Sequence, residues 1–179
     1  MKKLQLLPVG PADARLLDWL RQALQDKFQV KGEILSPGLD LSFAVHAERQ
    51  QYHSSEILGA MQRYVQRDTW KLLGVTSCDL YIPILTFVFG EAQVGGSAAI
   101  VSYHRLKQQF YGLPEDLDLL ANRLLIESVH ELGHTLRLTH CDDYRCAMAA
   151  SHAVEWIDLK DSGYCDSCVS RVLDIGETG

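Results

Sequence analysis

The sequence lacks three features: an excess of positive charge, a long apolar run and an internal repeat. Its 17 lysines and arginines are outnumbered by 23 aspartates and glutamates, which gives a formal net charge of −6. A phosphate-binding surface needs a basic face, so we expect no nucleic-acid partner. Because no apolar stretch approaches the roughly 20 residues that span a bilayer, we also expect no association with a membrane.

The N-terminus also lacks the pattern of a secretory signal peptide. Residues 1–8 contain two lysines, but the apolar run that follows is short and ends at Pro8, whereas a signal peptide has about 7–15 apolar residues. We therefore expect a cytoplasmic protein with reduced thiols. There is no low-complexity tract or long linker, and 47% of the 179 residues are hydrophobic. These features favour one domain over residues 1–179 and, we expect, a monomer.

Three histidines and a glutamate follow a metal-binding spacing. His130 and His134 are four residues apart, so on a helix they lie on one face, about 6 Å apart along its axis. Glu131 lies beside them, where it can take a proton from a water molecule that the metal holds. His140 completes His-Glu-x-x-His-x-x-Gly-x-x-His in every position but one. Three neutral imidazoles leave one open position on a tetrahedral Zn²⁺, so the pattern predicts a catalytic zinc.

The exception is Arg137, which stands where this motif has glycine. If the helix continued, His140 would lie about 9 Å beyond His134 along the axis. The chain must therefore leave the helix near residue 137, in the left-handed conformation that favours glycine. An arginine there costs about 1–2 kcal/mol, whereas a bound zinc contributes on the order of 10 kcal/mol. We expect the turn to form, and an activity-impaired or non-catalytic zinc-binding protein is the alternative.

Four of the five cysteines form two closely spaced pairs. Cys141 and Cys146 are followed, after 18 residues, by Cys165 and Cys168. Each pair can supply two thiolates from one turn, so the spacing predicts a closed structural zinc site. The alternative is two disulfides in a secreted protein. Cys78 stands apart, and we expect it to be a buried core thiol.

In this combination the chain resembles the archaemetzincins, a branch of the metzincin clan of zinc metallopeptidases. The resemblance starts near residue 50 and includes the segments 51–54 and 87–92. It rests on the motif residues His130, Glu131, His134, His140, Cys141, Cys146, Met148, Cys165 and Cys168. It implies a metzincin-type α/β (α+β-like) fold, in which a mixed twisted sheet packs on two helices and an active-site helix. Residues 1–136 would form an N-terminal subdomain, and residues 137–179 a small zinc-stapled C-terminal subdomain.

The resemblance also implies how the parts of the site work. Two zinc ions would bind per chain, one catalytic and one structural, and Met148 would form a Met-turn beneath the imidazoles. An edge strand within residues 87–102 would line a cleft and pair with an extended peptide. The expected reaction is hydrolysis of a peptide bond in a peptide or small protein, with Glu131 as general base. Hydrolysis of a non-peptide amide would use the same chemistry.

Hydrophobic periodicity gives a coarse map of the elements. Apolar residues at helical spacing predict helices over 11–28, 54–68 and 113–136, with a short helix over 166–173. We expect Ser54 or Ser55 to cap the second helix, and the third to begin at Pro114 with Glu115 and Asp116 in its first turn. Short runs rich in β-branched and aromatic residues predict strands over 3–7, 28–35, 41–45, 77–82, 85–89 and 97–102.

Overall fold

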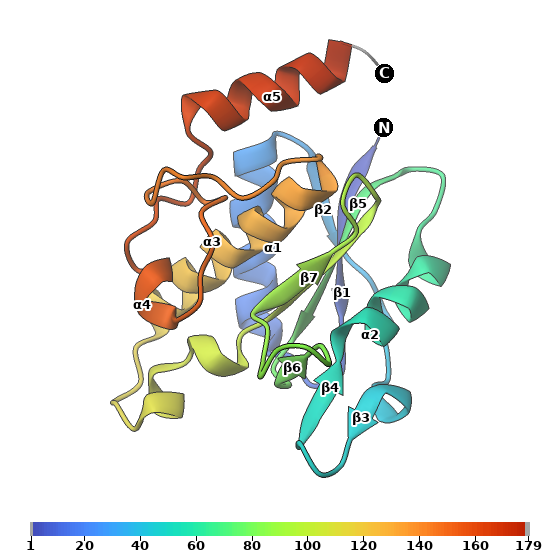
Figure 1. Ribbon diagram of the computed structural model, residues 1–179. Coiled ribbons are helices and arrows are strands. Elements are labelled where there is room, and N and C mark those ends of the chain that lie inside the picture. The colour runs from blue at the N-terminus through green and yellow to red at the C-terminus, as the bar shows by residue number, and fades with distance from the viewer. Residues whose placement is uncertain (1, 178–179) are drawn as a thin grey trace.

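The computed structural model describes residues 2–177, and its main sheet has five strands (Figure 1). The strand order is β2-β1-β5-β8-β7, in which every neighbouring pair is parallel except β7 and β8. A smaller sheet has the order β3-β4-β6. The strands are β1 (Lys3–Pro8), β2 (Lys31–Ile34), β3 (Val45–His46), β4 (Gln51–His53), β5 (Thr69–Thr76), β6 (Leu80–Tyr81), β7 (Gly90–Ala92) and β8 (Ala98–Ser102).

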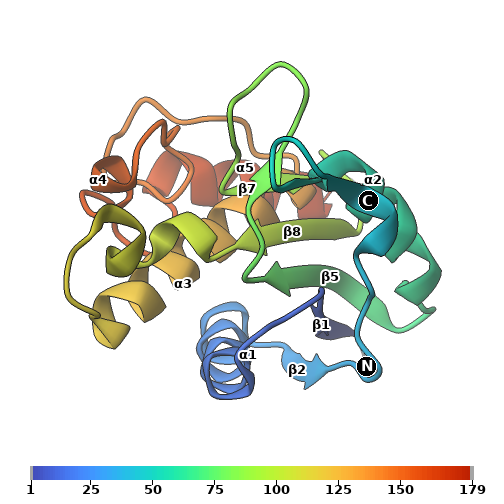
Figure 2. The same ribbon diagram turned by 90° about the horizontal axis from the view of Figure 1, so that it is seen from below.

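Helices cover both faces of the main sheet. The first and third helices lie on one face and the second lies on the other, as the view along the sheet shows (Figure 2). The two remaining helices follow the third in the chain. The helices are α1 (Ala14–Phe28), α2 (Ser54–Met61), α3 (Leu117–Thr135), α4 (Val154–Ile157) and α5 (Asp166–Glu177). Short 3-10 turns occupy Ser42–Ala44, Gln62–Tyr64, His104–Leu106 and Gln108–Tyr111.

The sheet divides the buried apolar residues into two layers. Along β1, Leu4 and Leu6 face α1 and α3, whereas Leu7 faces α2. Alternate residues of a strand point to opposite faces, and because both faces are covered the strand is apolar on both. The mixed α/β fold expected from the sequence is confirmed, and the active-site helix α3 is a buried element of its larger layer.

The most important correction concerns β5. Our sequence analysis assigns no strand to residues 69–76, yet β5 is the central strand of the main sheet. Lys71 and Gly74 interrupt its apolar run. Lys71 is nevertheless buried, because its ammonium donates to the carbonyl oxygens of Gly96 at 2.7 Å and Thr135 at 2.8 Å. Gly74 leaves room for Met61, whose sulfur would lie 2.8 Å from a Cβ at that position.

Several other predicted boundaries are wrong. Residues 85–89 form a loop instead of a strand, and the strand β7 follows them. The stretch 41–45 is mostly a 3-10 turn, residues 77–82 contain only the two-residue β6, and α2 ends at Met61 instead of residue 68. The cap of α2 is His53, which accepts from the N–H of Glu56, and the cap of α3 is Asp116, which accepts from that of Leu119. Segments this short give little periodic signal, so their limits depend on tertiary contacts.

Within residues 2–177, no helix has both the length and the apolar character that crossing a membrane requires.

Candidate active site and metal centres

The active-site helix ends where the sequence predicted. After α3 the N–H of Leu138 donates to Gly133 O and that of Arg137 to His134 O, both at 3.0 Å. This is the bond pattern of a Schellman motif, which needs a left-handed residue just past the helix. Arg137 is that residue, with φ of 66°. The predicted bend is therefore confirmed, and it is formed with an arginine in place of glycine.

The strain at Arg137 gives a testable prediction. Replacing Arg137 by glycine removes a left-handed cost of about 1–2 kcal/mol, partly offset by the greater backbone freedom of glycine in the unfolded chain. We expect the free energy of unfolding to rise by about 1 kcal/mol, measured by urea denaturation of the zinc-loaded protein. Gln29→Gly is a matched control, because Gln29 ends α1 with φ of 53° and does not line the histidine cleft. A less stable Arg137→Gly protein would mean that arginine packing outweighs the strain.

The side chain of Arg137 is exposed and lies over the loop between β7 and β8. A Cβ added to Gly95 would come within 3.0 Å of Arg137 Cγ. The same loop is tied to the end of α3, because the N–H of Gly95 donates to His134 O at 2.9 Å. Arg137 is not among the described residues that line the histidine cleft.

The bend brings the three histidines together. Their candidate ligand nitrogens all lie within 4.8 Å of one another, and the Nε2 atoms of His130 and His134 are 3.1 Å apart. A tetrahedral zinc with bonds of about 2.0–2.1 Å has ligand nitrogens about 3.3 Å apart, so the spacing fits this ion. In His130 and His134 the other ring nitrogen, Nδ1, points away from this common position. His130 Nδ1 faces Ala147 O at 2.7 Å, and His134 Nδ1 faces Leu138 O at 2.8 Å.

The protonation of the histidines also suits a cation. A carbonyl can only accept, so Nδ1 carries the proton in both His130 and His134, and each Nε2 presents a lone pair. Burial, together with the nearby ammonium of Lys160, lowers the pKa of His130 to about 3. Burial also lowers the pKa values of His134 and His140. Three neutral imidazoles with converging lone pairs are the donor set that zinc prefers.

Glu131 lies against the strand β7, and both line the cleft. A Cβ at Gly90 would come within 2.7 Å of both Cγ and Oε1 of Glu131. Glycine at this position therefore gives the carboxylate its room, a role that only the tertiary structure reveals. Glu131 is buried, and burial together with the carboxylates of Glu127 and Glu91 raises its pKa well above the ordinary value.

The cleft is open and has a volume of about 510 Å³. One wall is the edge strand β7 with the loop before it, and the other includes residues 150–152 and the three histidines. The predicted edge strand within residues 87–102 is thus confirmed as a lining of the cleft. Its apolar contributors include Leu85, Phe87, Phe89 and Val94.

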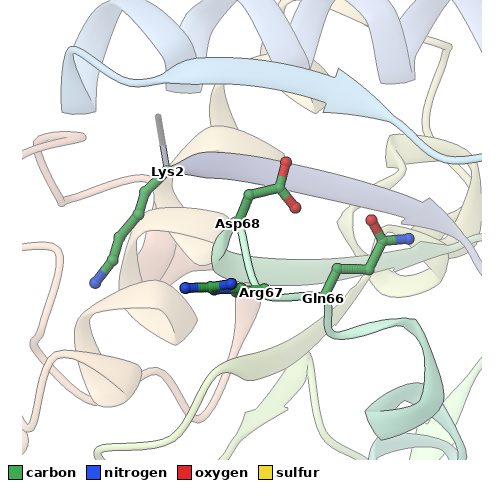
Figure 3. Close-up of a pocket in the computed structure, with 4 residues that line it drawn as sticks. All are labelled: Lys2, Gln66, Arg67 and Asp68. Carbon is green, nitrogen blue, oxygen red and sulfur yellow. The ribbon is translucent and has the colours of Figure 1, made fainter.

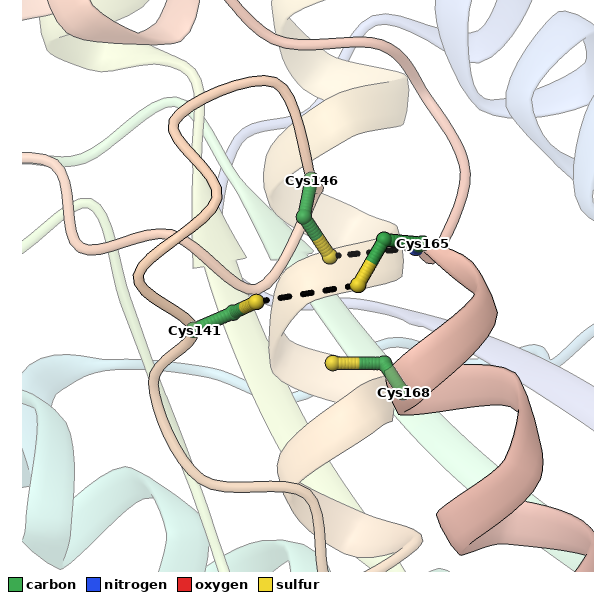
Figure 4. A group of neighbouring side chains, drawn as sticks. All are labelled: Cys141, Cys146, Cys165 and Cys168. Carbon is green, nitrogen blue, oxygen red and sulfur yellow. Dashed lines mark hydrogen bonds between the residues drawn. The ribbon is translucent and has the colours of Figure 1, made fainter.

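The four predicted cysteines form a second cluster (Figure 4). Cys141 and Cys146 come from the loop after α3, and Cys165 and Cys168 from the start of α5, with their sulfurs directed toward one another. All four sulfurs lie within 4.8 Å of one another, and those of Cys141 and Cys165 are 3.7 Å apart. A disulfide needs about 2.05 Å, whereas a four-thiolate zinc with bonds of about 2.3 Å has sulfurs about 3.8 Å apart. The geometry favours metal over the two-disulfide alternative.

Backbone N–H groups donate to sulfurs of this cluster, while burial raises the pKa values of Cys146 and Cys168. The N–H groups of Met148 and Cys165 donate to Cys146 Sγ at 3.4 and 3.3 Å. A hydrogen bond from the backbone of Cys168 lowers the pKa of Cys165. Thiolates, and not thiols, ligate metals. Cys78, which we expected to be buried, is partly exposed.

Met148 connects the two clusters. It is fully buried, its carbonyl accepts from the N–H of Cys141 at 3.0 Å, and its sulfur packs against Gly133 so closely that a Cβ there would overlap it. Gly133 lies between Glu131 and His134 on α3, so the thioether supports the helix turn that carries the ligands.

Sequence reasoning missed a buried charge pair next to the site. Glu127 lies one helical turn before Glu131 and lines the cleft, and Lys160 Nζ is 3.5 Å from Glu127 Oε1. Helical spacing could have placed Glu127 on the face of Glu131. Nothing near Lys160 in the sequence indicates its position, because it comes from the segment between α4 and α5.

A separate hollow lies beside the first residues of the central strands (Figure 3). Lys2, Gln66, Arg67 and Asp68 line it, where β1 and β5 begin. It contains none of the histidines or cysteines of the two clusters. The chemistry of the site therefore lies in the cleft beside β7.

Comparisons with known proteins agree with this geometry. The model of peptidase family M54 matches residues 24–174. The chain is 39% identical over 170 residues to an archaemetzincin of Methanocaldococcus jannaschii, covering 94% of this chain and 92% of that protein. It is 35% identical over 175 residues to the archaemetzincin of Pyrococcus furiosus, with 93% and 90% covered.

Solved structures show the same relationship. A crystal structure of archaemetzincin from Archaeoglobus fulgidus, complexed with malonate, has a TM-score of 0.81 at 34% identity and covers 94% of this chain and 99% of that one. A zinc-dependent peptidase from Methanocorpusculum labreanum has a TM-score of 0.85 at 26% identity, with the same coverage. The family match and the close relatives together show that this chain belongs to peptidase family M54, the archaemetzincins, and that it is a zinc metallopeptidase.

Proposed function

We propose that the chain hydrolyses peptide bonds in the cleft beside β7, with His130, His134 and His140 as the ligands of a catalytic zinc and Glu131 as general base. The observation that carries the proposal is the convergence of three imidazoles in an open cleft that also contains a buried carboxylate. Zinc, when bound there, would polarise the scissile carbonyl and lower the pKa of a water molecule toward about 7.

Glu131 moves the proton in this proposal. Its carboxylate accepts a proton from the attacking water and later donates it to the nitrogen of the departing amine. Burial raises the pKa of Glu131 above its ordinary value, and a carboxylate with a higher pKa is a stronger proton acceptor. Gly90 keeps the carboxylate free of a steric clash, and Met148 supports the helix turn beneath it.

The edge strand β7 is the proposed platform for the substrate backbone. Phe89 O accepts from the N–H of Ser102, and the N–H of Gln93 donates to Ala98 O. Ladder bonds alternate along an antiparallel pair, so the N–H and C=O groups of Gly90 and Ala92 face away from β8. An extended peptide can pair with them, while the apolar residues around β7 contact its side chains.

The four cysteines are proposed to hold a second, structural zinc, which makes two ions per chain. Four thiolates leave no open position for substrate. Because Cys141 follows His140 directly, this ion would fix the segment that presents the third histidine. We retain the division into residues 1–136 and 137–179 as part of the proposal. The monomeric state and the cytoplasmic location stay predictions from the sequence.

The alternative is a zinc-binding protein that Arg137 has made inactive. Two observations support the enzyme instead: Arg137 accommodates the left-handed turn, and its side chain lies over Gly95 outside the cleft lining. Native mass spectrometry and cleavage of a peptide library test the choice. We expect two zinc ions per chain, hydrolysis that a chelator abolishes, and one ion in His134→Ala. A single ion, or two ions without cleavage of any peptide, would favour the inactive protein.

A further inference from the structure

Two ion pairs, one of them fully buried, attach the segment after α4 to α3. Arg123 and Glu127 are one turn apart on α3. Arg123 Nη2 is 2.6 Å from Asp158 Oδ2, and Lys160 Nζ is 3.5 Å from Glu127 Oε1. The helix supplies the cation of the first pair and the anion of the second. The segment after α4 supplies their partners, Asp158 and Lys160. The pair of Glu127 and Lys160 lies nearer the histidines.

The ammonium of Lys160 contacts more than this carboxylate. It donates to Ala149 O at 2.5 Å and lies 3.4 Å from Ala147 O, and its side chain is 1% exposed. These two carbonyls flank Met148. Without water to replace them, a buried ammonium must keep its protein acceptors, which restricts the conformation of the turn.

One of these carbonyls also orients a metal-ligand candidate. Ala147 O accepts from His130 Nδ1 at 2.7 Å and from Lys160 at 3.4 Å. The partner of the distal ring nitrogen sets the tautomer and the direction of a metal-binding imidazole. Lys160 therefore connects to His130 through a single backbone oxygen.

We propose that Lys160 is a positioning residue, which fixes the carbonyls on both sides of Met148 and through Ala147 holds the imidazole of His130 toward the metal position. The inference rests on the proposed function of the three histidines. It assigns Lys160 a role in zinc retention that is separate from neutralising Glu127.

A double variant distinguishes a purely structural role of Lys160 from a positioning role. Lys160→Met leaves Glu127 buried without a cation, which is destabilising whatever else Lys160 does. Lys160→Met combined with Glu127→Leu removes both charges, and such replacements of buried pairs are often neutral or stabilising. If charge pairing were the whole role, the double variant would recover every property of the parent. A positioning role predicts recovered stability but continued loss of zinc.

The experiment compares the zinc-loaded parent, Lys160→Met, the double variant and Glu127→Gln. Transfer of zinc to a chelator gives the affinity of the histidine site, and nitrogen NMR of labelled histidine gives the Nδ1–H signal of His130. We expect the affinity to fall about 10-fold in both proteins that lack Lys160, since outer-shell partners of ligands typically contribute 10–100-fold. The His130 signal should shift in both. Glu127→Gln keeps the carbonyl contacts, so its affinity and signal should match the parent.

Arg123→Met is the matched control. Like Lys160, Arg123 is a buried cation that contacts a carboxylate and a backbone oxygen, in its case Leu106 O at 2.9 Å, but none of its hydrogen bonds to the described residues reaches the turn at Met148. Its loss should lower the melting temperature without shifting the His130 signal. Parent-like affinity and signal in the double variant would overturn the role of Lys160. A parent that binds no zinc at the histidines would overturn the assignment of the site itself, so the two failures are distinguishable.

Discussion

Replacing Glu131 by glutamine is expected to abolish most peptide hydrolysis while both zinc ions remain bound. Glutamine has nearly the same shape and fits against Gly90, but its amide cannot accept the proton of the attacking water. General acid–base catalysis contributes about 10²–10⁴-fold, so we expect kcat to fall about 10³-fold. That is a loss of about 4 kcal/mol of transition-state stabilisation. Steady-state cleavage of a fluorogenic peptide, with zinc content measured on the same sample, checks the result.

Two further expected results make this test specific. His134→Ala removes a ligand instead of the base, so it should lose activity together with one zinc ion, whereas Glu131→Gln loses activity alone. KM should change little in the glutamine variant, because the substrate backbone is proposed to bind β7 and not Glu131. Parent-like cleavage by Glu131→Gln would assign the proton transfer to another group.

The second large effect is expected from Cys168→Ser. This change removes one of four converging thiolates, and the remaining three would lose the structural zinc. Structural zinc contributes on the order of 10–16 kcal/mol in small zinc domains, which is as large as the whole stability of an ordinary domain. We expect the segment from residue 141 to residue 173 to lose its packing, and His140 to leave the catalytic site with it.

Hydrogen exchange measured by mass spectrometry would show this loss. Amides in residues 141–173 should exchange faster in Cys168→Ser, whereas those of the central strands β1 and β5 stay protected. Cys78→Ser is the matched control, because Cys78 lies outside the cluster and its loss should leave both ions in place. Parent-like exchange of residues 141–173 in Cys168→Ser that lacks this zinc would show that apolar packing alone holds the segment.

The local parts of the fold could be predicted from the sequence, and the contact-dependent parts could not. The helices α1 and α3 have long amphipathic or apolar patterns, so their existence and approximate limits followed from periodicity. The strand β5 did not, because Lys71 and Gly74 interrupt it. Lys71 is tolerated there only because two carbonyls from distant segments accept from its ammonium.

The candidate site divides in the same way. The ligands, the base and the four cysteines occupy fixed spacings, since short loops and one helix turn must bring them to a common point. Gly90 and Lys160 have no such spacing, and Glu127 has one only relative to Glu131 on α3. Their relation to the site arises where β7, α3 and the segment after α4 meet.

By itself, the sequence determined which side chains are available as metal donors and that the chain must turn back after Leu136 for the three histidines to meet, because spacing along one helix and one turn restricts where side chains can point. Only the tertiary structure decided that an arginine accepts the left-handed conformation there, that an edge strand forms the wall of the cleft, and that a buried lysine contacts the carbonyls beside Met148. Those features depend on contacts between segments far apart in the chain, and no local sequence pattern specifies the free energies of such contacts.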